Sequence, residues 1–143
     1  DVISVGTAFV RYLELAKELK NKVIVIIDND GNTDKLKNKY DQYNKYDNIK
    51  IYYQDKNNFE DFEIDINNNE KKINIDTLEP NLLKANNYDI TLFNKIFGKE
   101  YTSIGKLLNY MLNNKVECAL KIFEYSDKIK YPKYILEALN ECE

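Results

Sequence analysis

The chain has 143 residues, enough for one domain with a buried core. Hydrophobic residues at 43%, charged residues at 31% and a net charge of −3 exclude both a disordered chain and a strongly basic nucleic-acid binder. A nuclease that uses metal-bound carboxylates is not excluded, because bound cations reverse the local charge. Histidine is absent, so any catalysis must use carboxylates, lysines and hydroxyls.

The sequence also indicates where the protein works. Cys118 and Cys142 lack metal-ligand spacing and, with no signal peptide in the chain, are expected to be reduced thiols in the cytoplasm. The longest apolar run, residues 23–27, is far too short to cross a bilayer, so no membrane association is expected. The opening "DVISVG" predicts a strand and a turn without an initiator Met, which indicates a fragment of a longer protein.

Strands and helices are predicted to alternate in the first part of the chain. Strands are expected at 2–5, at 22–27, which is apolar on both faces, and at 49–53; helices are expected at 7–20 and 34–46. Such alternation predicts a parallel sheet covered by helices. The residues expected to face the core are Phe9, Tyr12, Leu13, Ala16 and Leu19 in the first helix, and Leu36, Tyr40 and Tyr43 in the second.

The second half of the chain is predicted to be helical after one irregular stretch. "FEDFEIDI" and "KKINID" favour a hairpin, and Thr77 is a candidate cap for a helix that starts at Glu79 and Pro80. The following helices are "DITLFNKIFG", ending on Gly98, then "SIGKLLNYMLNN", "KVECALKIFEYS" and "YPKYILEALNE". Their expected core residues are Leu107, Leu108, Met111 and Leu112, and then Ala119, Leu120 and Phe123.

One stretch, "VIVIIDNDG", suggests chemistry. Asp28 and Asp30 stand one residue apart at the carboxyl end of the most apolar strand, the end at which parallel sheets bind ligands. Two carboxylates so close repel each other, and a divalent cation with oxygen ligands would compensate for that repulsion. An Asp cap followed by an Asp-Gly turn is an equally good interpretation of these residues.

Several segments in order resemble the Toprim domain of OLD-family (overcoming lysogenization defect) ATP-dependent endonucleases. These are "DVISVGTAF", "VIVIIDNDG", "IDTLEPNLLKAN" and residues 107–139, which are similar to the family's N-K-T-E-x-A-L stretch and closing P-x-Y-I helix. Val116 replaces the usual Thr, and "SVGTAF" has one glycine where relatives often have two.

The resemblance implies a Toprim-like, Rossmann-like α/β fold: a single nuclease domain over 1–143 whose first strand lies outside this chain. Its parts would be a βαβαβ core at 1–56, an insertion at 57–76 and a helical part at 77–143. It further implies that Asp28, Asp30 and Glu79 bind Mg²⁺ or Mn²⁺, completed by an upstream glutamate. Lys115 would stabilise charge on the scissile phosphate.

Each of these residues also has an ordinary structural interpretation. Glu79 would favour a helix N-terminus through the macrodipole, and Lys115 would be a solvated lysine. Glu117 is expected to be an ion-pair partner or a surface residue, and Cys118 a buried, inert thiol. Tyr52 and Tyr53 could stack on bases, although 12 tyrosines in the chain favour core or surface use.

The resemblance therefore predicts a divalent-metal-dependent DNA endonuclease domain that hydrolyses or nicks phosphodiester bonds in an OLD-type ATPase–nuclease, in a setting of phage defence. Its partners would be DNA, an upstream ATPase domain of the same polypeptide that binds ATP, and further copies of the full-length protein. The alternative is a catalytically incomplete Toprim-like regulatory or protein-interaction domain. A response-regulator receiver is disfavoured, because receivers carry their acidic pair after the first strand.

Overall fold

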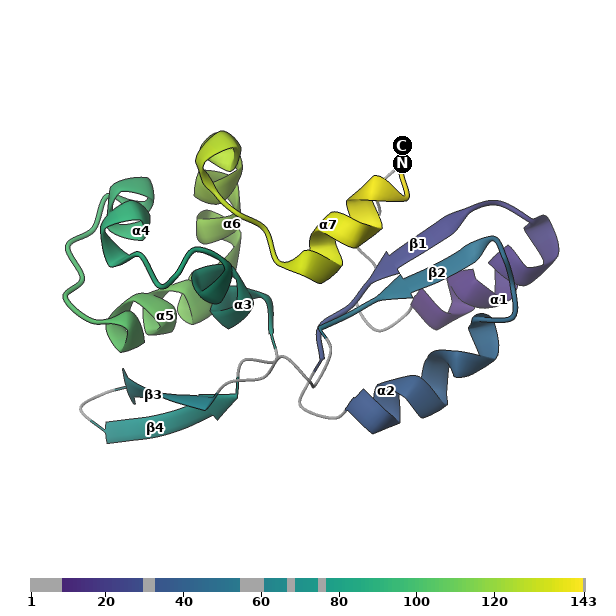
Figure 1. Cartoon of the computed structure of the whole chain (residues 1–143), viewed down its shortest axis with the longest axis horizontal. Helices are drawn as coiled ribbons and strands as arrows, with labels where there is room; N and C mark the ends of the chain where they lie inside the picture. The colour runs from purple at the N-terminus through teal and green to yellow at the C-terminus, as the bar shows by residue number, and fades with distance from the viewer. Residues whose placement is uncertain (1–8, 30–32, 55–60, 67–68, 75–76, 143) are drawn as a thin grey trace.

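The structure is a computed structural model that describes residues 9–29, 33–54, 61–66, 69–74 and 77–142. It is a mixed α/β fold, mostly helical, with a small two-stranded parallel sheet flanked by helices. Figure 1 shows two lobes: α1, α2, β1 and β2 form the N-terminal lobe, whereas α3 to α6 and the β3–β4 hairpin form the C-terminal lobe. The predicted strand at 2–5, the possible cap Thr7, and Asp30 lie outside the described residues.

The N-terminal lobe is built around the parallel pair β1 (Val23–Ile26) and β2 (Ile49–Tyr52), aligned so that Val23 is opposite Ile49. The helices α1 (Phe9–Leu19) and α2 (Thr33–Tyr40), with the 3-10 turn Asp41–Tyr43, share one apolar core with the sheet. The strand–helix–strand crossover predicted from the sequence is therefore present. The buried members of this core are Phe9, Leu13, Ala16, Tyr40, Tyr43 and Ile49.

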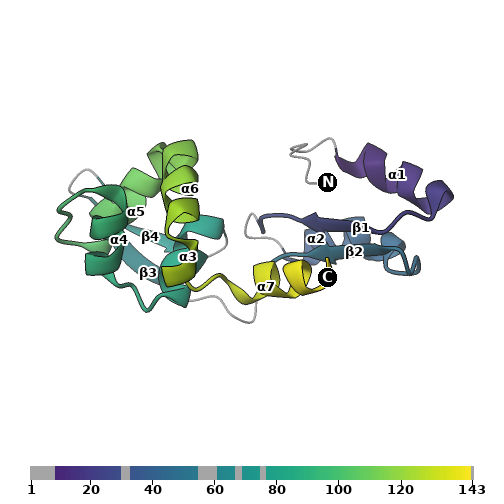
Figure 2. The same cartoon turned by 90° about the horizontal axis from the view of Figure 1, so that it is seen from above.

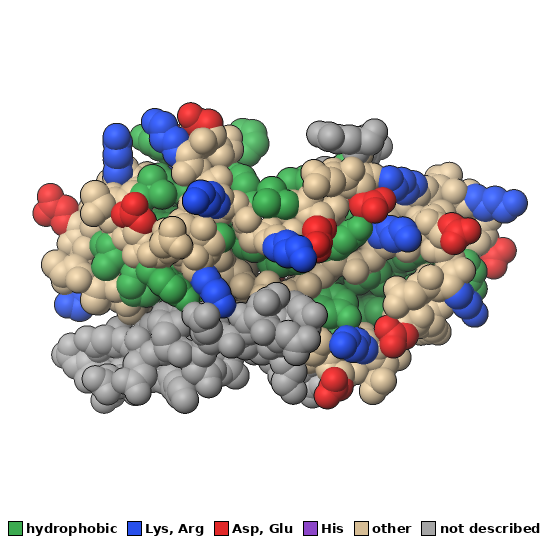
Figure 3. All heavy atoms as spheres, viewed as in Figure 1, with side chains coloured by type: hydrophobic (Ala, Val, Ile, Leu, Met, Phe, Trp, Pro, Cys, Tyr) green, Lys and Arg blue, Asp and Glu red, His purple; other side chains and the backbone are tan. Residues whose placement is uncertain are grey.

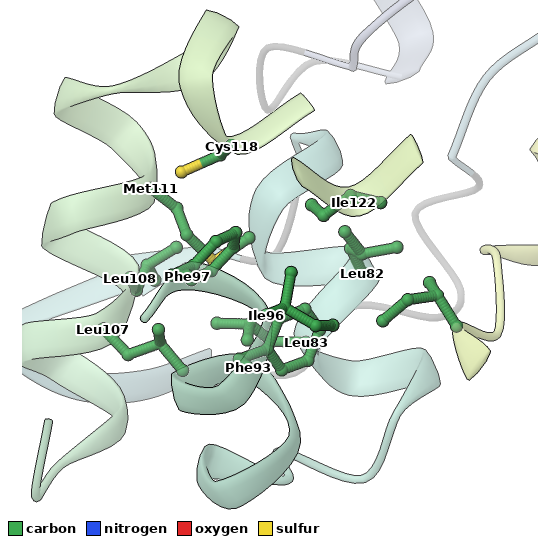
Figure 4. Packing of buried hydrophobic residues seen from close by; sticks show 11 residues of the cluster. Leu82, Leu83, Phe93, Ile96, Phe97, Leu107, Leu108, Met111, Cys118 and Ile122 are labelled. Carbon is green, nitrogen blue, oxygen red and sulfur yellow. The ribbon is translucent and has the colours of Figure 1, made fainter. Parts of the chain in front are cut away.

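The C-terminal lobe contains four short helices and a hairpin. The helices are α3 (Leu78–Ala85), α4 (Ile90–Phe97), α5 (Ile104–Asn113) and α6 (Lys115–Glu124), which a 3-10 turn, Ser126–Lys128, follows. The strands β3 (Asp61–Ile66) and β4 (Asn69–Asn74) pair antiparallel, as predicted, and β3 packs against α5. Figure 4 shows the core of this lobe, where leucine and phenylalanine side chains from α3, α4 and α5 converge.

Local sequence signals explain the ends of these helices. Asp89 accepts a hydrogen bond from the backbone N–H of Leu92 and caps α4, and Ser103 caps α5 through Lys106 N–H in the same way. Gly98 ends α4 with φ +64°, a left-handed conformation that favours glycine. Thr77 occupies the N-cap position of α3, although its side chain makes no capping hydrogen bond.

The last helix, α7 (Lys133–Asn140), returns to the N-terminal lobe and packs on β1 and β2. Figure 2 shows α1 and α7 on opposite sides of the two strands, so helices cover both faces of the small sheet. The cover on β1 is incomplete, because Ile26 is exposed. The prediction of a central strand buried on both faces is thus only partly correct.

Two expectations about helix faces are wrong. In α1, Phe9, Leu13 and Ala16 are buried as predicted, but Tyr12 and Leu19 are exposed. In α6, Ala119, Leu120 and Phe123 face solvent, and Cys118 and Ile122 occupy the core instead. Figure 3 shows hydrophobic side chains at the surface among charged ones.

The sequence of α6 carries two overlapping apolar stripes, and the one with Cys118 and Ile122 packs into the core. Lys121 donates to the Phe97 carbonyl at 3.0 Å in this orientation. Glu117, on the same side of the helix, accepts a hydrogen bond from Tyr110. In this orientation Phe123 is 76% exposed. Within the described ranges, no helix has the length and apolar character needed to cross a membrane.

Candidate metal centre

Asp28 stands where the parallel sheet ends. The backbone N–H of Ile27 still donates to the Tyr52 carbonyl at 3.0 Å, which fixes the chain immediately before Asp28 to the neighbouring strand. The side chain of Asp28 is exposed. A carboxylate in this position is oriented by the sheet and remains accessible to a ligand.

Asn29 anchors the loop that carries Asp28. Its side-chain amide is fully buried and donates to the Gln54 carbonyl at 2.9 Å and to the Thr33 hydroxyl at 3.0 Å. Gln54 follows β2 and Thr33 begins α2, so one amide ties the loop to both neighbouring elements. The middle residue of the D-N-D stretch is therefore structural, whereas Asp28 is presented to solvent.

Glu79 and Lys115 are brought together, although 36 positions separate them in the sequence. Glu79 lies in the first turn of α3 and Lys115 begins α6, and the Lys115 Nζ is 3.2 Å from the Glu79 Oε1. The Glu79 side chain is 12% exposed and that of Lys115 is 56% exposed. Two residues that the resemblance selected thus form one ion pair.

The second oxygen of Glu79 has an unusual environment. Glu79 Oε2 is buried and has no hydrogen-bond partner within the described part of the chain. A buried carboxylate oxygen without a donor costs free energy, so such a group marks a place where a ligand would be favourable. A divalent cation that prefers oxygen ligands fits this group.

Tyr134 is a buried phenol on which the charges of two candidate ligands act. It lies in the first turn of α7 and is 6% exposed. Burial, and then the negative charges of Asp28 and Glu79, raise the pKa of the Tyr134 phenol. One phenol is therefore within electrostatic reach of carboxylates from both lobes.

The grouping of these carboxylates is looser than a closed coordination shell. Among the residues that the structure describes, no three acidic or sulfur side chains converge closely enough to hold a metal ion. Asp30, the remaining predicted ligand, lies outside those residues. The described candidate residues are thus Asp28, on the loop that Asn29 anchors, and Glu79 in its ion pair with Lys115.

Other residues singled out from the sequence have structural roles. Glu117 pairs with Lys121 at 2.9 Å, as expected for an ion-pair partner. Cys118 is buried, and burial raises the pKa of its thiol to about 11, which disfavours the reactive thiolate. Tyr52 is half-buried near the end of α7, and burial together with Glu141 raises the pKa of its phenol.

Asn29 and Tyr134 were not selected from the sequence as site residues. Asn29 lies between two candidate ligands, and a buried polar residue at that point could have been suspected only once the loop was known to fold against β2. Tyr134 is one of 12 tyrosines, and its role depends on α7 returning to the sheet. Comparisons of the chain with models of protein families, with curated proteins and with solved structures found no match.

Proposed function

We propose that this chain is a Toprim-like, divalent-metal-dependent DNA endonuclease domain of the OLD type that hydrolyses phosphodiester bonds. The observation that best supports the proposal is Glu79, whose buried Oε2 lacks a donor and whose other oxygen pairs with Lys115. In the larger protein, the resemblance implies an upstream ATPase domain that binds ATP. It also implies a DNA substrate and a role in phage defence in the cytoplasm.

The roles of the residues follow from their chemistry. Asp28, Asp30 and Glu79 would hold Mg²⁺ or Mn²⁺ through carboxylate oxygens, with a further glutamate from upstream sequence. When bound, the cation supplies Lewis-acid activation of water and of the phosphate. Lys115 has an exposed ammonium beside Glu79, so its positive charge can approach a phosphate oxygen at little desolvation cost.

Metal binding is the first test of this function. Mn²⁺ titration by calorimetry is expected to show binding to the wild-type chain and a clear loss of affinity in Asp28→Asn and in Glu79→Gln. Glu124→Gln is the matched control, because Glu124 is an exposed acid at the far end of α6. An equal loss of affinity in all three variants would indicate nonspecific attraction to an acidic protein and would contradict the proposal.

Cleavage of supercoiled DNA is the second test. With Mn²⁺ and the natural upstream sequence attached, nicking is expected in the wild type. Lys115→Met is expected to lose most of this nicking without any loss of Mn²⁺ affinity, because it removes a cation that competes for Glu79. The chain by itself is expected to cleave weakly or not at all, since one metal ligand would come from outside it. Strong cleavage by the chain alone would refute the expectation of a missing ligand.

The alternative is a catalytically incomplete regulatory or interaction domain. The Lys115–Glu79 ion pair favours it, because the pair satisfies one oxygen of Glu79 without any metal. Such a domain has no need for convergent carboxylates. Absence of Mn²⁺ binding in both the chain and its extended form would support this alternative.

A further inference from the structure

A short lysine segment, "KIKYPK" at 128–133, joins the 3-10 turn after α6 to the start of α7. Its three lysines are exposed, whereas Ile129 and Pro132, which lie between them, are buried. Asp127 precedes the segment, and no acidic residue lies within it, although the whole chain has a net charge of −3. Positive charge is therefore concentrated locally on an acidic protein.

The backbone of the lysine segment is fixed to the end of α3. The Asn86 side-chain amide donates to the Lys130 carbonyl at 2.8 Å, and the Lys130 N–H donates to the Asn86 Oδ1 at 2.9 Å. Asn86 is itself buried, and Ile129 belongs to the core of the C-terminal lobe. The lysines are thus carried on an anchored backbone, so only their side chains lose conformational freedom when an anion binds.

The helix that anchors the lysine segment also carries the candidate residue Glu79. Asn86 is the C-cap of α3 and follows Glu79 by seven positions, which places the two residues on one face of the helix, about 10 Å apart. Lys115 pairs with Glu79 at one end of this face, and the backbone of Lys130 contacts Asn86 at the other. Lysines therefore border both ends of the face of α3 that carries Glu79.

The lysines of the segment are accessible to an anion. Within the ranges that the structure describes, Lys128 and Lys130 form no ion pair with a carboxylate. Lys133 pairs with Glu137, one turn further along α7, at 3.3 Å, and the Lys133 side chain is 83% exposed. Exposed pairs of this kind are weak, so a phosphate can replace the Glu137 carboxylate.

We propose that the lysine segment is a DNA-binding surface that holds the phosphate backbone near the candidate metal centre. The inference rests on the proposed function and names the surface that positions its substrate. Lysine side chains are flexible point charges that bind phosphates without reading the base sequence. Phosphates follow one another at about 3.4 Å along the axis of one DNA strand, so the distance of about 10 Å along α3 corresponds to roughly three phosphates. The segment is thus placed to bind the backbone a few nucleotides from a scissile bond at Glu79.

Removing the charges of the segment tests the inference, and the whole chain offers a matched control. The test variant combines Lys128→Gln, Lys130→Gln and Lys133→Gln. The control variant replaces three exposed lysines in and after α4 and in α5, and combines Lys95→Gln, Lys99→Gln and Lys106→Gln. Both variants lose the same charge, and each loses one lysine that lies over a tyrosine ring: Lys128 over Tyr125 at 5.5 Å, and Lys99 over Tyr110 at 5.2 Å.

The measurement is fluorescence anisotropy with a labelled DNA duplex, in NaCl from about 50 to about 200 mM and with EDTA, so that no metal contributes. Circular dichroism checks that each variant is folded. The wild-type chain is expected to bind the duplex. The test variant is expected to bind about tenfold more weakly at the lowest salt, and the slope of log affinity against log salt is expected to fall by about two to three. The control variant is expected to change the slope by less than about one.

Three results would overturn the inference: no binding of the duplex by the wild-type chain, wild-type-like binding by the test variant, or equal losses in both variants. Each of them leaves the proposed metal centre standing if Mn²⁺ still binds through Glu79. If Mn²⁺ does not bind but the test variant alone loses DNA affinity, the nuclease function fails and the lysine segment remains a DNA-binding surface. The two proposals can therefore fail separately.

Discussion

The cores of the two lobes differ in size and composition. The C-terminal core is aliphatic and phenylalanine-rich, with Phe93, Leu83 and Leu107 fully buried. The N-terminal core is smaller and includes the tyrosines Tyr40 and Tyr43, and polar side chains complete it. The difference matters because a lobe with little apolar area to bury depends more on hydrogen bonds at its edges.

Asparagine side chains provide many of those hydrogen bonds. Asn29 ties the loop after β1 to β2, and Asn48 donates to the carbonyls of Ala16 and Asn21, which joins the end of α1 to the start of β2. In the C-terminal lobe Asn86 and Asn94 make similar bonds to Lys130 and Tyr101.

The largest expected effect comes from emptying the C-terminal core. Phe93→Ala is expected to lower the free energy of unfolding by about 3–5 kcal/mol, because Phe93 has 0% exposure and its removal leaves a cavity. Phe123→Ala is the control, since Phe123 is exposed on α6, and it is expected to change stability by less than about 0.5 kcal/mol. Denaturant unfolding monitored by circular dichroism measures both. Equal losses of stability in the two variants would show that Phe123 is not on the exposed face of α6.

A smaller loss is expected from the polar contacts of the N-terminal lobe. Asn29→Ala and Asn48→Ala each remove an amide that bridges two partners, and each is expected to cost roughly 1–3 kcal/mol. Only Asn29→Ala is expected to weaken Mn²⁺ binding as well, because it releases the loop that carries Asp28. Calorimetry beside denaturant unfolding separates the two effects. Equal Mn²⁺ affinity in both variants would show that Asn29 does not support metal binding.

The end of α4 offers a more local test. Gly98→Ala is expected to cost about 1 kcal/mol, because a Cβ disfavours the left-handed backbone at φ +64° even though no atom within 4 Å would clash with it. Gly98→Asn should cost less, since asparagine tolerates this conformation better. Thermal unfolding of the two variants gives the comparison. A larger loss in the Asn variant would contradict a conformational origin.

The smallest expected effect is a pH dependence of stability that appears only in alkaline solution. Burial, then a hydrogen bond to Glu14, raises the pKa of Tyr43 to about 12, and burial with a hydrogen bond to Glu117 does the same for Tyr110. The folded state therefore retains these protons after the unfolded chain begins to lose them near pH 10. Stability should decline as the pH rises from about 10 to about 12.

Alkaline unfolding measures this decline in each lobe. Tyr43→Phe and Tyr110→Phe should each make the decline shallower, because phenylalanine has no proton to lose. A decline of the same steepness in both variants and the wild type would show that other groups cause it.

Much of the local structure was predictable from the sequence. The spacing of Phe9, Leu13 and Ala16 predicted the buried face of α1, and the turn at Gly98 and the hairpin at 61–74 follow from ordinary signals. The buried face of α6 was not predictable, because two apolar stripes overlap there and only packing against the neighbouring helices places Cys118 and Ile122 in the core. Hydrophobic periodicity cannot choose between stripes of similar strength.

The sequence by itself determined the α/β alternation of the first part of the chain and the position of Asp28 at the end of an apolar strand, because periodicity and strand composition are local properties. It also gave most helix ends, although the helix predicted over 34–46 ends at Tyr40 and continues only as a 3-10 turn. Only the tertiary structure decided that Lys115 pairs with Glu79, that Asn29 is buried, and that Tyr134 lies within electrostatic reach of carboxylates from both lobes. These relations depend on α7 returning to the sheet and on the packing of α3 against its neighbours. Contacts between residues so distant in the chain arise from packing, which a local pattern does not encode.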